Sequence, residues 1–246
     1  MRSAFVKTEN YVRFGNAIKA VEQRGAKEAG MLLVHGQPGY GKSAIIENWA
    51  VNNAAIFLRA NVDWTPKYFL IELAKTMKKP TQGTAEQLFA RLLAEISATE
   101  VPIVIDEAEN TLNNSAAVLE KIRDFSDRAE SIVVLVGMAD IKRRIARHQQ
   151  ISSRIAQVVE FQAASLNDTG AVCKQLAEVE IVSDLVTEIH RQTAGRMRLI
   201  LNAIAQIERA AKSSGLDKIG LEHIGKKSLV YDWQEKGSSG NAKTTN

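Results

Sequence analysis

A short glycine-rich stretch holds the residues of this sequence with the clearest chemical potential. It reads Gly36-Gln37-Pro38-Gly39-Tyr40-Gly41-Lys42-Ser43 and is followed by Ala44. The spacing fits G-x-x-x-x-G-K-[ST], the P-loop pattern, in which backbone N–H groups of a glycine-rich turn surround phosphate oxygens. In such a loop the lysine reaches the β- and γ-phosphates, and the serine hydroxyl binds Mg²⁺. Residues 36–44 are therefore predicted to bind ATP. A glycine-rich turn that fits the pattern by chance is the alternative.

Two adjacent carboxylates end an apolar run farther along the chain. Val101-Pro102-Ile103-Val104-Ile105 leads directly into Asp106 and Glu107. In a Walker B motif, a buried strand delivers two acids. The first holds Mg²⁺ through water, and the second orients and polarises the attacking water. We therefore predict Asp106 as a metal contact and Glu107 as the catalytic base. A helix N-terminus with two acids that suit its dipole is the alternative.

Both motifs need elements that hold them at one edge of a sheet. Apolar runs predict strands, and segments with apolar residues at helical spacing alternate with them. The predicted strands cover residues 31–34, 55–59, 101–105, 131–137 and 157–161. A fully apolar run such as 131–137 is typical of a parallel strand covered on both faces. The sequence therefore predicts an α/β fold with a doubly wound parallel sheet.

After residue 161 the pattern changes to helices only. Apolar residues at helical spacing indicate four helices: through 172–179, from Ser183 to Gly195, from Arg196 to Ser213, and over 221–227. The residues after Tyr231 are polar and predicted to be disordered. We predict a P-loop core with its N-terminal helix at 1–162, a small helical lid at 163–230 and a disordered tail at 231–246. The N-terminal helix either covers the adenine or only packs on the core.

The overall composition argues against several classes of protein. Of the 246 residues, 45% are hydrophobic and 24% are charged, which is ordinary for a globular protein. No apolar run approaches the length of a membrane span, and the start lacks a signal peptide. One cysteine, Cys173, and four histidines offer neither a disulfide framework nor a transition-metal site. A net charge of +4 permits a nucleic-acid partner without requiring one. We expect a cytoplasmic protein with no membrane partner, located in the host cytoplasm if a phage encodes it.

The two motifs and the helical C-terminal region together resemble the AAA+ ATPases over residues 5–228. Within that class the chain is similar to the transposition ATPases, the family of the bacteriophage Mu B protein and related transposon target selectors. Three stretches support this closer likeness: Lys7-Thr8-Glu9-Asn10 leading into Val34-His35-Gly36-Gln37-Pro38-Gly39, then Val104-Ile105-Asp106-Glu107-Ala108-Glu109, and Leu135-Val136-Gly137-Met138-Ala139-Asp140. The resemblance implies a slow ATPase, stimulated by assembly or DNA, that forms a helical homo-oligomeric filament on double-stranded DNA. Such a protein recruits or activates a transposase, and ATP hydrolysis drives disassembly.

The resemblance also implies roles for arginines. Arg154, in Ile151-Ser152-Ser153-Arg154-Ile155, matches an arginine finger that acts on a neighbouring subunit, and Arg143, Arg144 and Arg147 are rival fingers. Arg198, in Gly195-Arg196-Met197-Arg198-Leu199, matches the lid arginine called sensor 2. For each, a solvated arginine is the alternative. Two residues depart from the family pattern. Tyr40 fills a position that is usually small, and Met138 stands where a polar sensor 1 residue is common, which implies slow hydrolysis.

The DNA surface is predicted only in outline. The sequence has no zinc finger, RNA-recognition motif or arginine-rich arm, so a DNA partner would be held through its phosphates rather than its bases. Candidate contacts are Thr65, Lys67, Lys78 and Lys79, and a solvated side chain is the alternative for each. Two other functions stay open: a helicase-loader-type ATPase, and an ATP-gated secretion or signalling switch without DNA contact.

Overall fold

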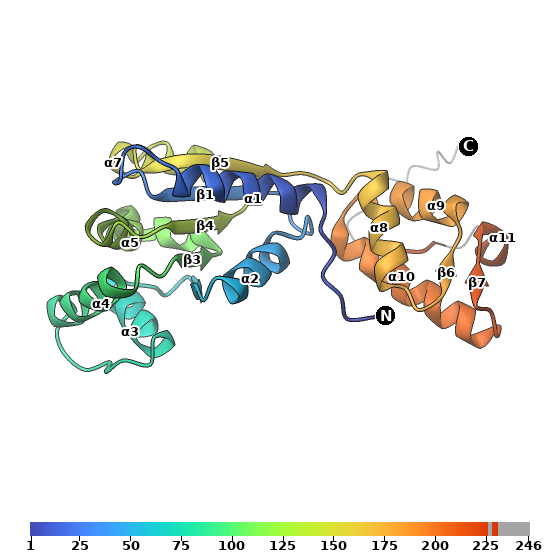
Figure 1. Ribbon diagram of the computed structural model, residues 1–246, viewed down its shortest axis with the longest axis horizontal. Coiled ribbons are helices and arrows are strands. Elements are labelled where there is room, and N and C mark those ends of the chain that lie inside the picture. Colours follow the sequence, from blue (N-terminus) through green and yellow to red (C-terminus); the bar gives the residue numbers. More distant parts are fainter. Residues whose placement is uncertain (226–227, 231–246) are drawn as a thin grey trace, which may run out of the picture. The chain divides into compact units, whose positions relative to one another are not determined.

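Five segments of the sequence form one parallel sheet in the computed structural model, which describes residues 1–225 and 228–230. The strands are β1 (Met31–Gly36), β2 (Ile56–Arg59), β3 (Ile103–Asp106), β4 (Val133–Gly137) and β5 (Ile155–Phe161). Their order across the sheet is β2-β3-β4-β1-β5, and Figure 1 shows β5, β1, β4 and β3 following one another. Every residue of β1, β3 and β4 is buried, as expected for parallel strands covered on both faces. The α/β fold with a parallel sheet is confirmed.

Helices cover the sheet and connect its strands. The first helix, α1 (Glu9–Glu22), and α2 (Lys42–Asn52) both contact β1. Alternate strand residues, such as Leu33 and Ile105, join a buried cluster with residues of the helices that follow β2 and β3. The remaining helices of this unit are α3 (Pro66–Thr76), α4 (Ala85–Thr99), the 3₁₀ helix η1 (Ala108–Leu112), α5 (Asn113–Ala129), α6 (Ile141–Ile145) and α7 (Gln149–Ser152).

Side-chain caps fix where two of these helices begin. The Thr65 hydroxyl accepts a hydrogen bond from the Tyr68 N–H at 3.2 Å, and Pro66 occupies the first position of α3. Thr84 and Gln87 form a reciprocal capping box at the start of α4. Because these bonds form between residues three apart, the sequence alone indicates both helix starts.

The chain divides into two compact units at residue 162. One unit is Lys7–Gln162, and the other combines Met1–Val6 with the residues from Ala163 onward. The sequence prediction also divides the chain after 162 but assigns residues 1–6 to the ATPase core. In the structure, Arg2 N–H donates to the Leu176 carbonyl at 2.7 Å, and Val6 packs against the apolar core of the second unit. This second unit is called the helical unit below.

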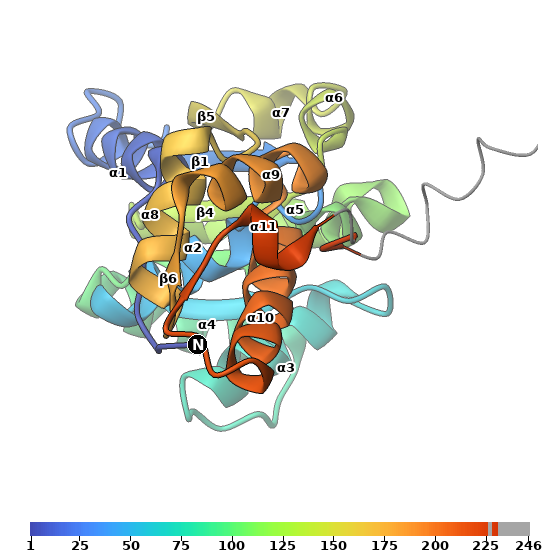
Figure 2. The ribbon, with the colours of Figure 1, turned by 90° about the vertical axis from the view of Figure 1, so that its right-hand side faces the viewer.

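The helical unit contains four helices and a small sheet within its described residues. They are α8 (Leu166–Leu176), β6 (Glu180–Ile181), α9 (Ser183–Thr193), α10 (Met197–Ser213), β7 (Lys218–Ile219) and α11 (Leu221–Ile224). Helix α9 contacts both α8 and α10, and Figure 2 shows these three helices together. The prediction of helices only is wrong here, because β6 and β7 pair in parallel. The sequence could not indicate these strands, because two residues are too few to show the alternation of apolar and polar side chains that marks a strand. The predicted tail at 231–246 lies outside the described residues.

Candidate nucleotide-binding site

The glycine-rich stretch forms the turn between β1 and α2. Gly36, Gly39 and Gly41 have φ values of +154°, +85° and +84°. Residues with a Cβ rarely adopt such angles, so this turn depends on glycine at these three positions. Gln37, Pro38 and Ala44 are exposed, and Gly39 to Ser43 are half-buried, so the loop remains accessible to a ligand. The chain thus places a row of backbone N–H groups at the start of α2, where the helix dipole favours an anion.

The neighbouring strand is a second reason for glycine at position 36. Gly36 pairs with Phe161 across β1 and β5. A Cβ at position 36 would lie 2.6 Å from the Phe161 carbonyl oxygen, closer than real contacts allow. The first glycine of the motif is therefore required by the packing of two strands as well as by the turn itself.

Lys42 points back into the loop. Its Nζ donates to the carbonyl oxygens of Gly36 at 2.7 Å and Gln37 at 3.0 Å. An ammonium group at this position brings a full positive charge beside the backbone N–H groups of the turn. The arrangement suits a polyphosphate, whose charge needs both hydrogen-bond donors and a cation.

A hydrogen bond joins the two sequence motifs. Ser43 Oγ donates to Asp106 Oδ2 at 2.9 Å, and Asp106 Oδ1 accepts from the Glu107 N–H at 2.9 Å. The Asp106 side chain is only 7% exposed, whereas that of Glu107 is 53% exposed. Glu107 has a φ of +53°, which turns the chain from β3 into η1. The fold therefore brings a hydroxyl, a buried carboxylate and an accessible carboxylate to the same edge of the sheet.

Arg59 at the end of β2 is a residue that the sequence prediction missed. It pairs in register with Asp106, because β2 and β3 are parallel neighbours. Its guanidinium lies 3.5 Å from Asp106 Oδ2 and 3.8 Å from Glu107 Oε1, and its Nη2 lies 3.2 Å from Glu47 Oε1. A positive group thus stands beside the two acids of the Walker B motif. Only the pairing of two strands reveals this, since no local motif includes an arginine at the end of β2.

His35, immediately before the loop, adds no charge at neutral pH. Its side chain is buried, and burial lowers the pKa of its imidazole below the ordinary value because the charged ring would lose hydration. His35 therefore adds no positive charge to that of Lys42 at this end of the sheet.

The N-terminal helix is tied to the P-loop. Asn10 Nδ2 donates to the carbonyl oxygens of Gln162 at 2.8 Å and Tyr40 at 3.4 Å, and Asn10 Oδ1 accepts from the Gln162 N–H at 3.1 Å. One side chain at the start of α1 therefore holds the P-loop and the segment after β5. Contact with an adenine remains a prediction.

The side chains at this edge fit a magnesium nucleotide. Ser43 and Asp106 present hard oxygen atoms, which Mg²⁺ prefers, and Lys42 with the loop backbone suits phosphates. Among residues 1–225 and 228–230, no group of three or more His, Cys, Asp or Glu side chains offers another metal site. In the same ranges, none of the helices has the length and apolarity needed to span a membrane.

Comparison with known families agrees with this geometry. The model of a family described as an AAA domain matches residues 23–145, which is half of the chain and includes both motifs. The chain belongs to the AAA family of ATPases. A protein of Staphylococcus aureus described as a potential ATP-binding protein is 30% identical over 131 residues, covering 50% of this chain and 47% of that protein. This AAA chain thus spans about half the length of that curated relative.

Several solved structures share the fold at low sequence identity. Cdc6p of Pyrobaculum aerophilum has a TM-score of 0.65 at 15% identity and covers 96% of this chain and 72% of its own. The ORC2 protein of Aeropyrum pernix, in its ADP form, has a TM-score of 0.64 at 13% identity over 93% of this chain and 69% of its own. The ORC1 protein of the same organism, in complex with DNA, has a TM-score of 0.61 at 16% identity and covers 91% of this chain and 65% of its own. At these identities, the likeness establishes the fold alone.

The other predicted residues lie away from the two joined motifs in sequence. Arg154 follows α7 and contacts Asp127, and the rival Arg144 donates to the Glu109 carbonyl at 3.2 Å. Arg143 and Arg147 are exposed, as is Arg198 in the first turn of α10 in the helical unit. Met138 is 38% exposed just after β4, and its N–H lies 3.4 Å from Glu109 Oε2. The roles of these residues remain predictions.

Proposed function

We propose that this AAA protein is an ATP-dependent, DNA-binding ATPase that oligomerises on double-stranded DNA and recruits or activates a transposase, with ATP hydrolysis driving disassembly. The ATPase part is supported by one observation above all. The P-loop serine lies within hydrogen-bond distance of a buried Walker B aspartate, with an accessible glutamate next in sequence. The transposase part is supported by the resemblance in sequence to transposition ATPases.

In this proposal, each residue of the site has a separate role in phosphoryl transfer. Lys42 and the loop N–H groups would hold the phosphates, and Ser43 and Asp106 would hold Mg²⁺, which supplies Lewis-acid stabilisation of the developing charge when bound. Glu107 is accessible enough to meet a water molecule, from which it accepts a proton. Arg198 stands in the first turn of α10, and that turn contains no acidic residue. The sensor 2 role proposed for it is supported by the resemblance in sequence.

Arg59 is expected to compete with Mg²⁺ for Asp106. Its guanidinium lies 3.5 Å from Asp106 Oδ2, on which Mg²⁺ also depends in this proposal. Replacing Arg59 by Gln removes that competing charge, so half-maximal ATP hydrolysis should need about two- to tenfold less Mg²⁺ at fixed ATP. A magnesium titration of hydrolysis measures this. Arg191→Gln, which removes an exposed arginine paired with Glu188 in the helical unit, is the control. An unchanged or higher magnesium requirement would contradict the competition.

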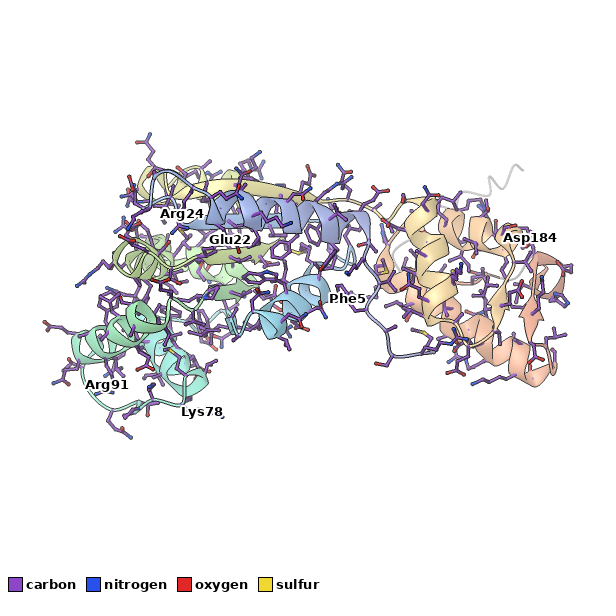
Figure 3. All side chains as sticks on the ribbon, viewed as in Figure 1. Phe5, Glu22, Arg24, Lys78, Arg91 and Asp184 are labelled. Atoms are coloured by element: carbon purple, nitrogen blue, oxygen red, sulfur yellow. The ribbon has the colours of Figure 1, made fainter. Side chains whose placement is uncertain are left out.

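DNA contact is proposed through backbone phosphates near α3. Lys67 and Lys78 are exposed and have no ion-pair partner in the described part of the chain, whereas Lys79 Nζ lies 2.8 Å from Glu95 Oε1. Lys78 stands in the turn after α3 (Figure 3). Thr65 is exposed, and its hydroxyl caps α3. The ORC1 protein of Aeropyrum pernix, which shares this fold, was solved in complex with DNA, and this supports the proposal of a DNA partner.

The structure distinguishes the candidate lysines by their partners. Lys67→Gln and Lys78→Gln should each weaken DNA binding for all sequences alike and reduce the slope of log affinity against log salt by about one. Lys79→Gln should change the slope less, because its charge is already paired with Glu95. Fluorescence anisotropy of labelled duplexes at several salt concentrations, with ATP and with ADP, measures the slopes. Salt-insensitive binding would contradict a phosphate-backbone surface.

Electron microscopy separates this function from the alternatives. With ATP, duplex DNA should induce helical filaments, and ADP should not support them. Closed rings on single-stranded DNA would favour a helicase loader instead. If DNA changes neither assembly nor the rate of hydrolysis, an ATP-gated switch is favoured. That result would contradict the DNA part of the proposal and leave the ATPase part unchanged.

A further inference from the structure

Arg154 is held by a carboxylate of its own chain. Its Nε donates to Oδ1 and Oδ2 of Asp127 at 3.0 and 3.1 Å, and its Nη1 donates to Ser153 Oγ at 3.2 Å. The two charged side chains are half-buried, with 32% and 22% exposed. Within the described part of the chain, Nη2 of Arg154 has no hydrogen-bond partner. The guanidinium of Arg154 is therefore fixed through Nε and Nη1, while Nη2 can bind another ligand.

The whole segment before Arg154 is fixed to α5. Glu120 lies seven residues before Asp127, so both project from the same face of that helix. Gln150 Nε2 donates to Glu120 Oε1 at 2.7 Å, and Ile151 between these contacts is fully buried in the core. This helix thus holds the segment through a polar contact at Gln150 and an ion pair at Arg154, while Ile151 between them belongs to the buried core.

Asp127 also belongs to a wider network of charges on α5. Arg123 lies between the two acids, with Nη1 2.8 Å from Glu120 Oε2 and Nε 3.7 Å from Asp127 Oδ2. Asp124 bonds Lys121 and Arg123, and within the described residues it forms no hydrogen bond or ion pair with Arg154. Of these two acids, Asp127 therefore has a bond to Arg154 that Asp124 lacks, and this difference can be tested.

We propose that Asp127 is a positioning residue for Arg154. The inference rests on the proposed function, with Arg154 as the arginine finger that the sequence resemblance implies, reaching the γ-phosphate of a nucleotide bound to the neighbouring subunit. A free arginine side chain samples many rotamers, and bonding through Nε removes most of this freedom before the neighbour arrives. Because such preorganisation acts on the reacting geometry, losing it should lower turnover more than nucleotide affinity.

The first test is a comparison of kinetic constants. Asp127→Asn should lower kcat for assembly-stimulated ATP hydrolysis by about ten- to a hundredfold and leave KM for ATP within about twofold. Asp127→Glu, which keeps the charge, should recover part of the loss. The matched control is Asp124→Asn, which makes the same change on the same helix without touching Arg154 and should retain the parent rate. Thermal unfolding and nucleotide binding of each variant establish that it is folded.

Mixing two variants then tests whether Asp127 acts in the subunit that donates Arg154 or in the subunit that binds the nucleotide. If Arg154 acts in trans, Glu107→Gln subunits can donate a functional arginine to Arg154→Ala subunits. Asp127→Asn should behave like Arg154→Ala, so that mixing it with Glu107→Gln restores activity. Mixing Asp127→Asn with Arg154→Ala should restore none, because every donated arginine is then defective. A defect in folding would not follow this pattern.

Each contrary result has a distinct meaning. Parent-like kcat in Asp127→Asn, together with an inactive Arg154→Ala, overturns the positioning role and leaves Arg154 as the finger. Complementation of Glu107→Gln by Arg154→Ala but not by Asp127→Asn also overturns it, since Asp127 would then serve the structure alone. Parent-like hydrolysis in Arg154→Ala overturns the trans finger itself, and that failure belongs to the proposed function.

Discussion

Glu107→Gln is expected to bind ATP as well as the parent protein and to hydrolyse it at least about a hundredfold more slowly. The amide has the size and shape of the carboxylate, and Asp106, which is bonded to Ser43, remains in place for Mg²⁺. The lost step is acceptance of a proton from the attacking water, which an amide oxygen cannot perform at neutral pH. Single-turnover hydrolysis, combined with binding of a fluorescent ATP analogue, separates the two effects.

Glu109→Gln is the matched control for this prediction. It makes the same change two residues later, in η1, where the carboxylate lies 3.4 Å from the Met138 N–H, a contact that an amide oxygen can also make. Its hydrolysis should stay within a few fold of the parent rate. Parent-like turnover in Glu107→Gln would remove Glu107 from the mechanism, and loss of ATP binding would show that its role lies in holding the nucleotide.

Gly36→Ala is expected to destabilise the protein by at least about 2 kcal/mol and to abolish nucleotide binding. An alanine at a φ of +154° is strained, and its Cβ would meet the Phe161 carbonyl oxygen at 2.6 Å. Relief requires β1 or β5 to move, and β1 leads directly into the P-loop. Urea unfolding measures the first effect, and binding of a fluorescent nucleotide measures the second.

Gly15→Ala is the matched control: it makes the same chemical change but is expected to stabilise the protein. Gly15 lies inside α1, and a Cβ there would meet no atom within 4 Å. Alanine has the higher helix propensity, so this variant should gain about 0.5–1 kcal/mol and bind nucleotide normally. If Gly36→Ala were as stable as the parent, the close approach of β1 and β5 would not constrain the loop.

The sequence by itself determined the elements whose signals are local. Strands β1 to β4 consist largely of apolar residues, whereas β5 also contains Gln157 and Glu160. The helix starts at Thr65 and Thr84 depend on bonds between residues three apart. The P-loop is also local, because its glycines, lysine and serine occupy eight consecutive positions. From these the parallel α/β fold could be predicted, and the two motifs with the helical C-terminal region resemble those of the AAA+ ATPases.

The tertiary structure alone decided which distant side chains meet. Arg59 reaches Asp106 because β2 and β3 are neighbours in register, and Asp127 holds Arg154 because α5 packs beside the segment before β5. The charge of Lys79 is paired with Glu95, while the neighbouring Lys78 stays exposed. Residues 1–6 pack with the helical unit, to which they are not adjacent in sequence. Each of these contacts joins segments that only strand pairing or helix packing brings together, and neither periodicity nor spacing along the chain carries that information.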